Sequence, residues 1–178
     1  MQKKKLLLHT CCAPCSTHVL ETLKNEYDIT IYYYNPNIYP KEEYQKRLAN
    51  AQKIANSLNI NLIEGNYSTG IWHEKAKGFE SEPEGGKRCA ICYSMRLENS
   101  ALFAKHHGFD LIATTLTISP HKDSKLINKI GKLMAAKHSI DFLEKDFKKD
   151  NGFRKSIELS KQHDLYRQKY CGCEFSRR

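Results

Sequence analysis

The chain has 178 residues, enough for one domain with its own hydrophobic core and too few for two. It is 40% hydrophobic and 28% charged, and none of its apolar runs approaches the length of a transmembrane helix, so we expect no membrane partner. The apolar run after the basic start, Leu6 to Leu8, is too short for a secretory signal, which favours a cytoplasmic protein. The formal net charge of +9 favours a polyanionic partner, first of all nucleic acid.

Apolar runs and turn residues predict strands that alternate with helices. The expected strands cover residues 3–10, 27–34, 61–64, 110–116 and 140–143. The expected helices cover residues 17–24, 41–58, 88–107 and 153–162, and one more begins at Ser119-Pro120-His121-Lys122. Residues 65–86 are expected to be irregular, and residues 163–178 to form a polar tail. This alternation predicts a parallel, doubly wound α/β sheet in a single domain, 1–178.

Seven cysteines fall into three tight groups along the chain. The groups are Cys11, Cys12 and Cys15, then Cys89 and Cys92, then Cys171 and Cys173. An odd number in such groups is a poor disulfide framework, and in a reducing cytosol it indicates metal binding or redox chemistry. The first group directly follows the first strand, and Pro14 stands where a helix would begin. It is therefore expected at the carboxyl edge of the sheet, where open α/β proteins bind ligands.

The first two groups could bind a metal in two ways. Cys89 and Cys92 are expected on one face of the first turn of a helix, where the helix dipole and the adjacent Lys87 and Arg88 favour the thiolate form. With Cys11 and Cys12 they would supply the four thiolates typical of a 4Fe–4S cluster. The spacing also allows a four-thiolate zinc site of Cys12, Cys15, Cys89 and Cys92, and a thioredoxin-like dithiol at Cys89 and Cys92 is a third alternative.

The third group, Cys171-Gly172-Cys173, has a different character. The glycine permits the tight backbone that a bridge between the two thiols needs. Such a bridge would be strained, and therefore oxidising and easily cycled. Two further metal ligands, or an exposed tail without a role, are the alternatives. Because four thiolates stand elsewhere, we favour a redox dithiol, which stores two electrons and so indicates a two-electron reduction.

Charged and aromatic residues near the last cysteines could contact RNA. They are Arg154, Lys155, Tyr166, Arg167, Lys169 and Tyr170. Rings that stack on splayed bases and cations that meet phosphates are typical of RNA binding, although a solvated basic face explains the pattern equally well. Ser119, His121 and Lys122 are expected at the junction between the strand 110–116 and the next helix, where they could hold a phosphate. His9 is expected to be a buried strand histidine and no metal ligand.

The motifs taken together resemble a known family. They are His9-Thr10-Cys11-Cys12-Ala13-Pro14-Cys15, Asn35-Pro36-Asn37-Ile38, Arg88-Cys89-Ala90-Ile91-Cys92 with Arg96-Leu97, Thr114-Thr115-Leu116 through Ser119-Pro120, and Tyr166-Arg167-Gln168-Lys169-Tyr170-Cys171-Gly172-Cys173. In this order and over nearly the whole chain, they resemble the cobalamin-independent epoxyqueuosine reductases. The resemblance implies a three-layer α/β sandwich with a mainly parallel sheet of about five strands, related to the PP-loop and HUP nucleotide-binding proteins.

The resemblance also implies an activity. It is the reductive removal of the epoxide oxygen of epoxyqueuosine at the tRNA wobble position to give queuosine, with tRNA as substrate and an electron donor as partner. A 4Fe–4S cluster would be held by Cys11, Cys12, Cys89 and Cys92, and Cys171 and Cys173 would form a redox-active disulfide. The tail, 163–178, would then fold back over the active site. Cys15 lies outside this set, as a spectator or as a ligand of an additional iron ion.

Two other classes of protein remain as alternatives. One is a zinc-stapled RNA-binding module without catalysis, which would be colourless where an iron–sulfur protein is coloured. The other is a tRNA thiolation enzyme of the PP-loop type. That enzyme would need a Ser-Gly-Gly-x-Asp-Ser phosphate loop after the first strand, and residues 10–16 read Thr-Cys-Cys-Ala-Pro-Cys-Ser instead.

Overall fold

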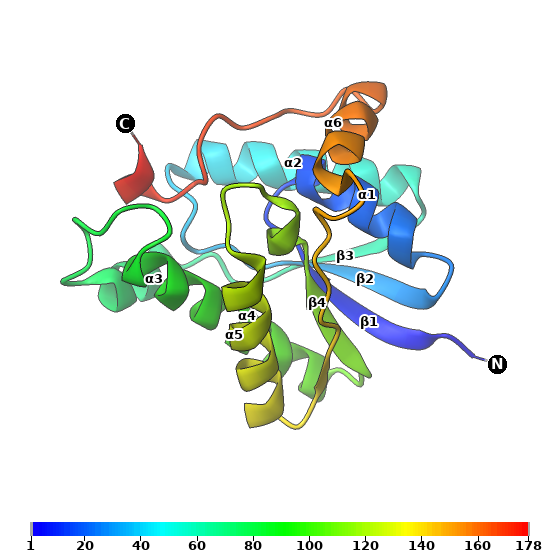
Figure 1. Ribbon diagram of the computed structural model, residues 1–178, viewed down its shortest axis with the longest axis horizontal. Coiled ribbons are helices and arrows are strands. Elements are labelled where there is room, and N and C mark those ends of the chain that lie inside the picture. The colour runs from blue at the N-terminus through cyan, green and yellow to red at the C-terminus, as the bar shows by residue number, and fades with distance from the viewer. Residues whose placement is uncertain (1, 178) are drawn as a thin grey trace.

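A computed structural model describes residues 2–177, in which one parallel sheet is flanked by helices (Figure 1). The strands are β1 (Lys4–His9), β2 (Tyr27–Tyr33), β3 (Asn61–Glu64), β4 (Leu111–Thr114) and β5 (Asp141–Phe142). The helices are α1 (Ala13–Leu23), α2 (Lys41–Ser57), α3 (Thr69–Ala76), α4 (Lys87–His106), α5 (Ser124–Lys137) and α6 (Gly152–Gln162), with short 3₁₀ helices η1 (Thr115–Ile118) and η2 (Glu174–Ser176). The strand order is β3-β2-β1-β4-β5 and every pair is parallel, which confirms the predicted α/β fold.

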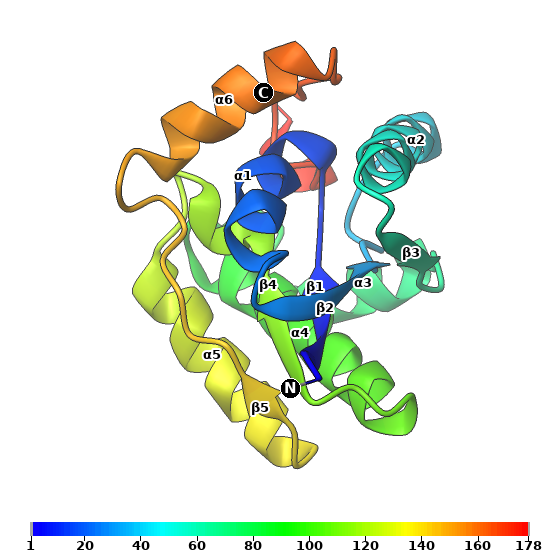
Figure 2. The ribbon, with the colours of Figure 1, turned by 90° about the vertical axis from the view of Figure 1, so that its right-hand side faces the viewer.

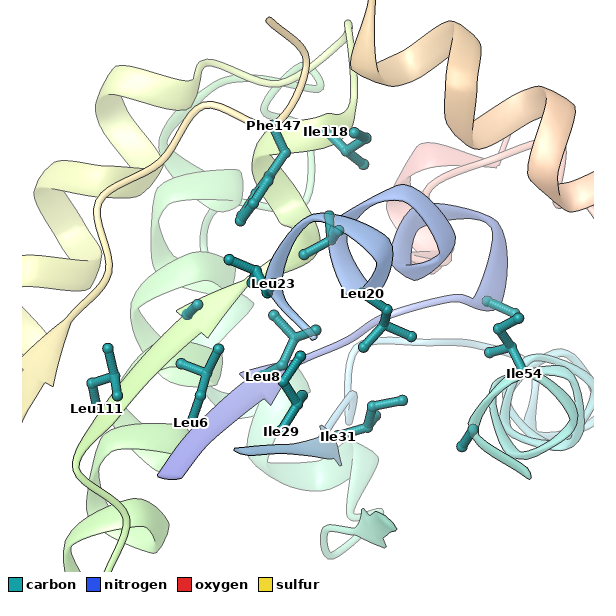
Figure 3. Close-up of a cluster of buried hydrophobic side chains, with 14 of the residues drawn as sticks. Leu6, Leu8, Leu20, Leu23, Ile29, Ile31, Ile54, Leu111, Ile118 and Phe147 are labelled. Atoms are coloured by element: carbon teal, nitrogen blue, oxygen red, sulfur yellow. The ribbon is translucent and has the colours of Figure 1, made fainter. Parts of the chain in front are cut away.

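The central strand β1 is apolar at consecutive positions because both faces of the sheet are covered. Leu6 and Leu8 pack on the side of α1 and α2, and Leu7 packs on the side of α4 and α5; all three are fully buried. Figure 2 shows α1, α2 and α6 on one side of the sheet and α4 and α5 on the other. Figure 3 shows the larger cluster, in which side chains of the strands meet Leu20 and Leu23 of α1. Burying each such leucine contributes about 1.5–3 kcal/mol, so β1 anchors the layers on both sides.

Three boundaries differ from the predicted ones by two residues or more, each for a local reason. Helix α1 begins at Ala13 and not at residue 17, because a proline in the first turn lacks only an N–H that has no helical partner anyway. Strand β4 ends at Thr114, whose hydroxyl accepts the N–H of Leu116 at 3.2 Å and starts η1. Helix α5 begins at Ser124, because the Asp123 carboxylate caps it. The helix expected to start at residues 119–122 therefore starts later.

The expectation that residues 65–86 are irregular is wrong for α3 (Thr69–Ala76). Trp72 and Ala76, four residues apart, are the two buried residues of this helix. One such pair is too little for a helical period to emerge from the sequence. The helix packs beside α4 and places Trp72 next to Cys92 and Cys173.

The segment after α6 crosses α2 and ends near α3 and α4 (Figure 1). The N–H of Tyr166 donates to Asn50 Oδ1 at 2.9 Å, and Glu174 contacts His73. Leu165 and Cys173 are buried, so this segment is less exposed than a polar tail. Its last residue, 178, lies outside the described residues. Within residues 2–177, no helix combines the length and apolar character that crossing a membrane requires.

Candidate active site

A cavity of about 400 Å³ opens at the carboxyl ends of the central strands. The chain runs from β1 outward to β2 and β3 in one direction, and through β4 to β5 in the other, so the strand order reverses between β1 and β4. Open α/β sheets bind ligands at this point. The cavity is lined by Cys11 and Cys15 after β1, by Leu116 after β4, and by residues of α4 and of the C-terminal segment.

Sulfur atoms from all three cysteine groups surround this cavity. The lining cysteines are Cys11, Cys15, Cys89, Cys92, Cys171 and Cys173. The seventh, Cys12, lies next to them, with its Sγ 3.9 Å from that of Cys11. The ligand atoms of Cys11, Cys12 and Cys15 all lie within 4.8 Å of one another. Residues up to 162 positions apart are thus brought to one place; the sheet topology accounts for the first two groups, and the segment after α6 brings in the third.

Two of these cysteines are joined in the structure. Cys12 and Cys15, which have the CxxC spacing, form a disulfide with their Cα atoms 5.6 Å apart. The other five cysteines are free thiols, including Cys171 and Cys173. While it is bonded to Cys15, Cys12 offers no thiolate to a metal. Metal binding by Cys12 therefore requires that this bridge be reduced.

Three of the four cysteines predicted as cluster ligands accept hydrogen bonds from N–H groups. The Gly85 N–H points to Cys89 Sγ at 3.2 Å, and Gln168 Nε2 donates to Cys12 Sγ at 3.0 Å. Arg96 Nη1 lies 3.8 Å from Cys92 Sγ. Such donors stabilise thiolates, and hydrogen bonds to the sulfurs are one of the factors that set the potential of iron–sulfur clusters. Once the Cys12–Cys15 bridge is reduced, the donor set fits a cluster bound by these thiolates.

Arg96 of α4 is buried beneath the sulfurs. Its Nη2 donates to Asn35 Oδ1 at 2.7 Å and its Nε donates to His9 Nε2 at 3.2 Å. Burial disfavours its charge, but the neighbouring sulfurs of Cys92 and Cys11 outweigh this and raise the pKa of Arg96. Because His9 Nε2 accepts, the proton of this imidazole is assigned to Nδ1, which lies 3.0 Å from Thr114 Oγ1.

His9 is fully buried at the end of β1, as the sequence predicts. Burial and the charge of Arg96 hold its pKa well below the usual value, so the ring is neutral. His9 and Asn35, which lies in the loop after β2, both accept hydrogen bonds from Arg96. Asn35 Nδ2 in turn donates to Thr10 O at 2.9 Å. The polar layer under the cysteines thus consists of a fixed positive charge and its neutral acceptors.

Burial outweighs the expected activation of the Cys89 and Cys92 thiols by positive charge, although Arg88 lowers the pKa of Cys89 and Arg96 lowers that of Cys92. Burial raises the pKa of Cys89, and it raises that of Cys92 to about 11. Arg88 turns away from them, and its Nη1 donates to the carbonyls of Phe79, Glu80 and Glu82 at 3.2, 2.6 and 2.5 Å. Deprotonation of these thiols therefore depends on the local N–H donors and on a bound cation.

The residues predicted to contact phosphates and bases lie partly at this cavity. Ser119, His121 and Lys122 line it after η1, and Arg167, Lys169 and Tyr170 line it from the C-terminal segment. Arg154 and Lys155 are exposed on α6. Tyr166 packs against α2: its hydroxyl donates to Glu43, and Lys46 Nζ lies 3.7 Å from the centroid of its ring. Fewer of the predicted RNA-contacting residues therefore line the cavity than the sequence pattern contains.

Several polar residues of the site have no role assigned from the sequence, although Asn37 and Gln168 stand in the motifs that resemble the family. Asn37 and Trp72 line the cavity, and within residues 2–177 neither Asn37 Oδ1 nor Trp72 Nε1 has a hydrogen-bond partner. Gln168 also lines it, beside Cys12. Arg96 also stands in one of these motifs, and its spacing points to the site because it follows Cys92 by four residues on the same helix face.

Comparisons with known proteins place the chain in a family. The family model described as "Epoxyqueuosine reductase QueH" matches residues 6–178. Proteins named epoxyqueuosine reductase QueH are similar over almost the whole chain. That of Acinetobacter baylyi is 44% identical, covering 98% of this chain and 81% of its own. That of Streptococcus pyogenes serotype M1 is 42% identical, covering 98% and 71%, and that of Thermotoga maritima is 39% identical, covering 96% and 89%. The chain belongs to the epoxyqueuosine reductase QueH family.

Proposed function

We propose that this oxidoreductase removes the epoxide oxygen of epoxyqueuosine at the wobble position of tRNA, leaving queuosine. The observation that carries the proposal is the convergence of three cysteine groups on one cavity of a chain in the QueH family. The noncatalytic zinc module is not favoured, because the relatives are named as reductases. Since the substrate is tRNA and five thiols are free, the proposed place of action is the cytoplasm.

The proposed cofactor is a 4Fe–4S cluster held by Cys11, Cys12, Cys89 and Cys92. Their convergence and the N–H groups that face Cys12, Cys89 and Cys92 support this set. When bound, the cluster supplies single electrons at the cavity wall. Cys15, within 4.8 Å of the first two ligands, is the proposed contact for an additional iron ion.

Cys171 and Cys173 are proposed to supply the two electrons and two protons of the reduction. When the two thiols form a disulfide they release two electrons and two protons, and the epoxide oxygen leaves as water while a carbon–carbon double bond forms. An external electron donor then reduces the disulfide. The C-terminal segment that carries the pair contributes Arg167 to Tyr170 to the cavity lining, which supports a tail folded over the active site.

The chain's own cations are proposed to guide the RNA to this cavity. Lys122, Arg167 and Lys169 stand on the rim and meet phosphates, and Tyr170 offers a ring for stacking. Asn37 and Trp72, with polar atoms that lack partners, lie in the wall and can bond to the modified base.

The test is anaerobic reconstitution of the reduced protein with iron and sulfide, followed by assay on tRNA that contains epoxyqueuosine. We expect a coloured protein with four irons in the cluster and conversion to queuosine in the presence of a chemical reductant. A colourless protein that binds zinc and RNA but leaves the epoxide intact would contradict the proposal.

Three substitutions separate the roles of the cysteines. Cys89→Ser removes a proposed ligand and should abolish the visible absorbance of the cluster, whereas Cys15→Ser, the matched control at the same cavity, should retain it. Cys171→Ser should keep the cluster and abolish turnover. Full turnover by Cys171→Ser would remove the dithiol from the reaction, and loss of the cluster from Cys15→Ser would favour the zinc-like ligand spacing.

A further inference from the structure

We infer that Arg47 is a positioning residue for the Cys171–Cys173 pair, an inference that rests on the redox role proposed for that pair. Arg47 belongs to α2 and precedes Cys171 by 124 residues. Its side chain is only 1% exposed. Within residues 2–177 it is absent from the cavity lining, so any effect on the chemistry must pass through the residues that it holds.

The guanidinium of Arg47 binds the two carbonyls that precede Gly172. Its Nη1 donates to Cys171 O and its Nη2 donates to Tyr170 O, both at 3.0 Å. The guanidinium is planar and presents its N–H groups in a fixed fork. Two consecutive peptide planes are therefore fixed relative to α2, and the backbone of Cys171 with them.

The same turn is held from its other side at Gly172. Gly172 O accepts the N–H of Tyr39 at 2.8 Å. Gly172 has φ +107°, which favours glycine, and a Cβ there would lie 2.9 Å from Ile38 Cγ1 and 3.0 Å from Arg47 Nη1. The turn between the two cysteines is thus pressed against Arg47 and the loop after β2.

The charge of Arg47 is balanced within the protein. Its Nε donates to Glu43 Oε1 at 2.7 Å, one turn earlier on α2, and Glu43 also accepts from the Tyr166 hydroxyl at 3.0 Å. The Glu43 side chain is 11% exposed. An arginine that is buried, paired and bonded to backbone carbonyls serves as a structural clamp and does not await a phosphate.

The clamp favours the reduced form of the pair. Both thiols are free in the structure in which these hydrogen bonds are made. Closing a bond between Cys171 and Cys173 must bring their sulfurs to about 2 Å, and Arg47 and Tyr39 oppose any rotation of the peptide planes around Gly172 that this closure uses. Arg47 therefore stabilises the dithiol relative to the disulfide, and its loss should make the reduction potential of the pair more negative.

The experiment titrates cluster-loaded protein, under anaerobic conditions, against mixtures of reduced and oxidised glutathione. After acid quench and alkylation, trypsin releases Tyr170–Arg177, which contains Cys171 and Cys173 and no other cysteine. The masses of this peptide give the disulfide fraction. For Arg47→Gln we expect a tenfold shift of the equilibrium constant toward the disulfide, equal to about 30 mV for two electrons. Arg47→Lys keeps a charge without the fork and should shift in the same direction.

Two controls separate this effect from a general loss of structure. Lys53→Gln changes an exposed cation of the same helix that contacts the tail at Asp164, and it should leave the midpoint unchanged. Gly172→Ala disturbs the same turn directly and should move the midpoint in the same direction as Arg47→Gln. If both Arg47 variants fail to fold, Gly172→Ala decides the question.

An unchanged midpoint in a folded Arg47 variant, or in Gly172→Ala where the Arg47 variants fail to fold, overturns the inference. A shift toward the dithiol also overturns it. The readout does not depend on turnover. If the wild-type protein leaves epoxyqueuosine intact while the midpoint shifts as expected, the proposed function fails and the positioning role of Arg47 stands.

Discussion

Replacing Arg96 with methionine tests the polar layer beneath the cysteines. Methionine has a similar length, but it has neither the charge nor the N–H groups that reach Asn35, His9 and Cys92. Arg96 is almost completely buried, so water cannot take over these contacts. We expect a folded protein of lower stability, in which the proposed cluster has a lower reduction potential.

The magnitude follows from the groups that lose their donor. Asn35 Oδ1 and His9 Nε2 would become buried acceptors without partners, at about 1–3 kcal/mol each. His9 can recover part of this, because a proton moved to Nε2 would face Tyr34 O at 3.3 Å. The expected loss is about 2–4 kcal/mol, which a domain of about 5–15 kcal/mol survives.

The expected change in potential comes from the lost charge. At the 3.8 Å that separates Arg96 Nη1 from Cys92 Sγ, two unit charges interact with about 4 kcal/mol at an effective dielectric constant of 20. That energy corresponds to an upper bound of about 170 mV for one electron. Because the charge of a cluster is spread over several atoms, we expect a decrease on the order of 100 mV.

Two measurements check these values. Urea unfolding of the reduced, metal-free protein gives the stability, and a redox titration followed by paramagnetic resonance gives the potential of the loaded protein. Arg154→Met, at an exposed ion pair on α6, is the matched control and should change stability by less than about 0.5 kcal/mol. An Arg96→Met protein that loses less than about 1 kcal/mol and keeps its potential would refute the reasoning.

Other parts of the molecule give further predictions. Burial and the charge of Lys155 lower the pKa of His18 in the folded protein. As the pH falls below about 6.5, the unfolded chain therefore binds this proton first, and the stability of the folded protein decreases. In His18→Gln, the urea midpoints measured between pH 7 and 5 should fall less steeply than in the wild type. Gly131→Ala places a Cβ 2.2 Å from Phe142 Cζ, and the forced repacking should cost about 1–3 kcal/mol in thermal unfolding. Asn37→Leu removes an oxygen without a partner, so it should leave the melting temperature unchanged while KM for the tRNA rises; an unchanged KM would exclude Asn37 from binding.

The strands and most helices could be predicted because their signals are local. The run Leu6 to Leu8 is buried on both faces, and α2 and α4 have helical periods that place their ends within one residue of the expected ones. Helix α3 has too few buried residues to show a period. The start of α5 depends on Asp123, a cap that the adjacent Ser119-Pro120 obscured.

The gathering of the first two cysteine groups could also be predicted, since the carboxyl ends of parallel strands meet at one edge. The surroundings of these sulfurs could not. Arg88 stands beside Cys89 in the sequence, yet backbone carbonyls of the preceding loop turn it away. Arg96 and Arg47 bind groups that are 61 and 124 residues distant. No local pattern indicates which remote carbonyl or amide a buried guanidinium will meet.

The two buried arginines hold parts of the site for which different tasks are proposed. Arg96 ties Cys92 to the ends of β1 and β2, so this part of the cavity wall is as rigid as the sheet. The Cys171–Cys173 turn has no strand beneath it, and it is held by Arg47 and Tyr39. The ligands of the proposed electron carrier must stay fixed, whereas the two sulfurs of the proposed dithiol must come together and separate at each turnover. Contacts that can be broken singly suit a segment that is proposed both to carry the dithiol and to lie where the RNA enters.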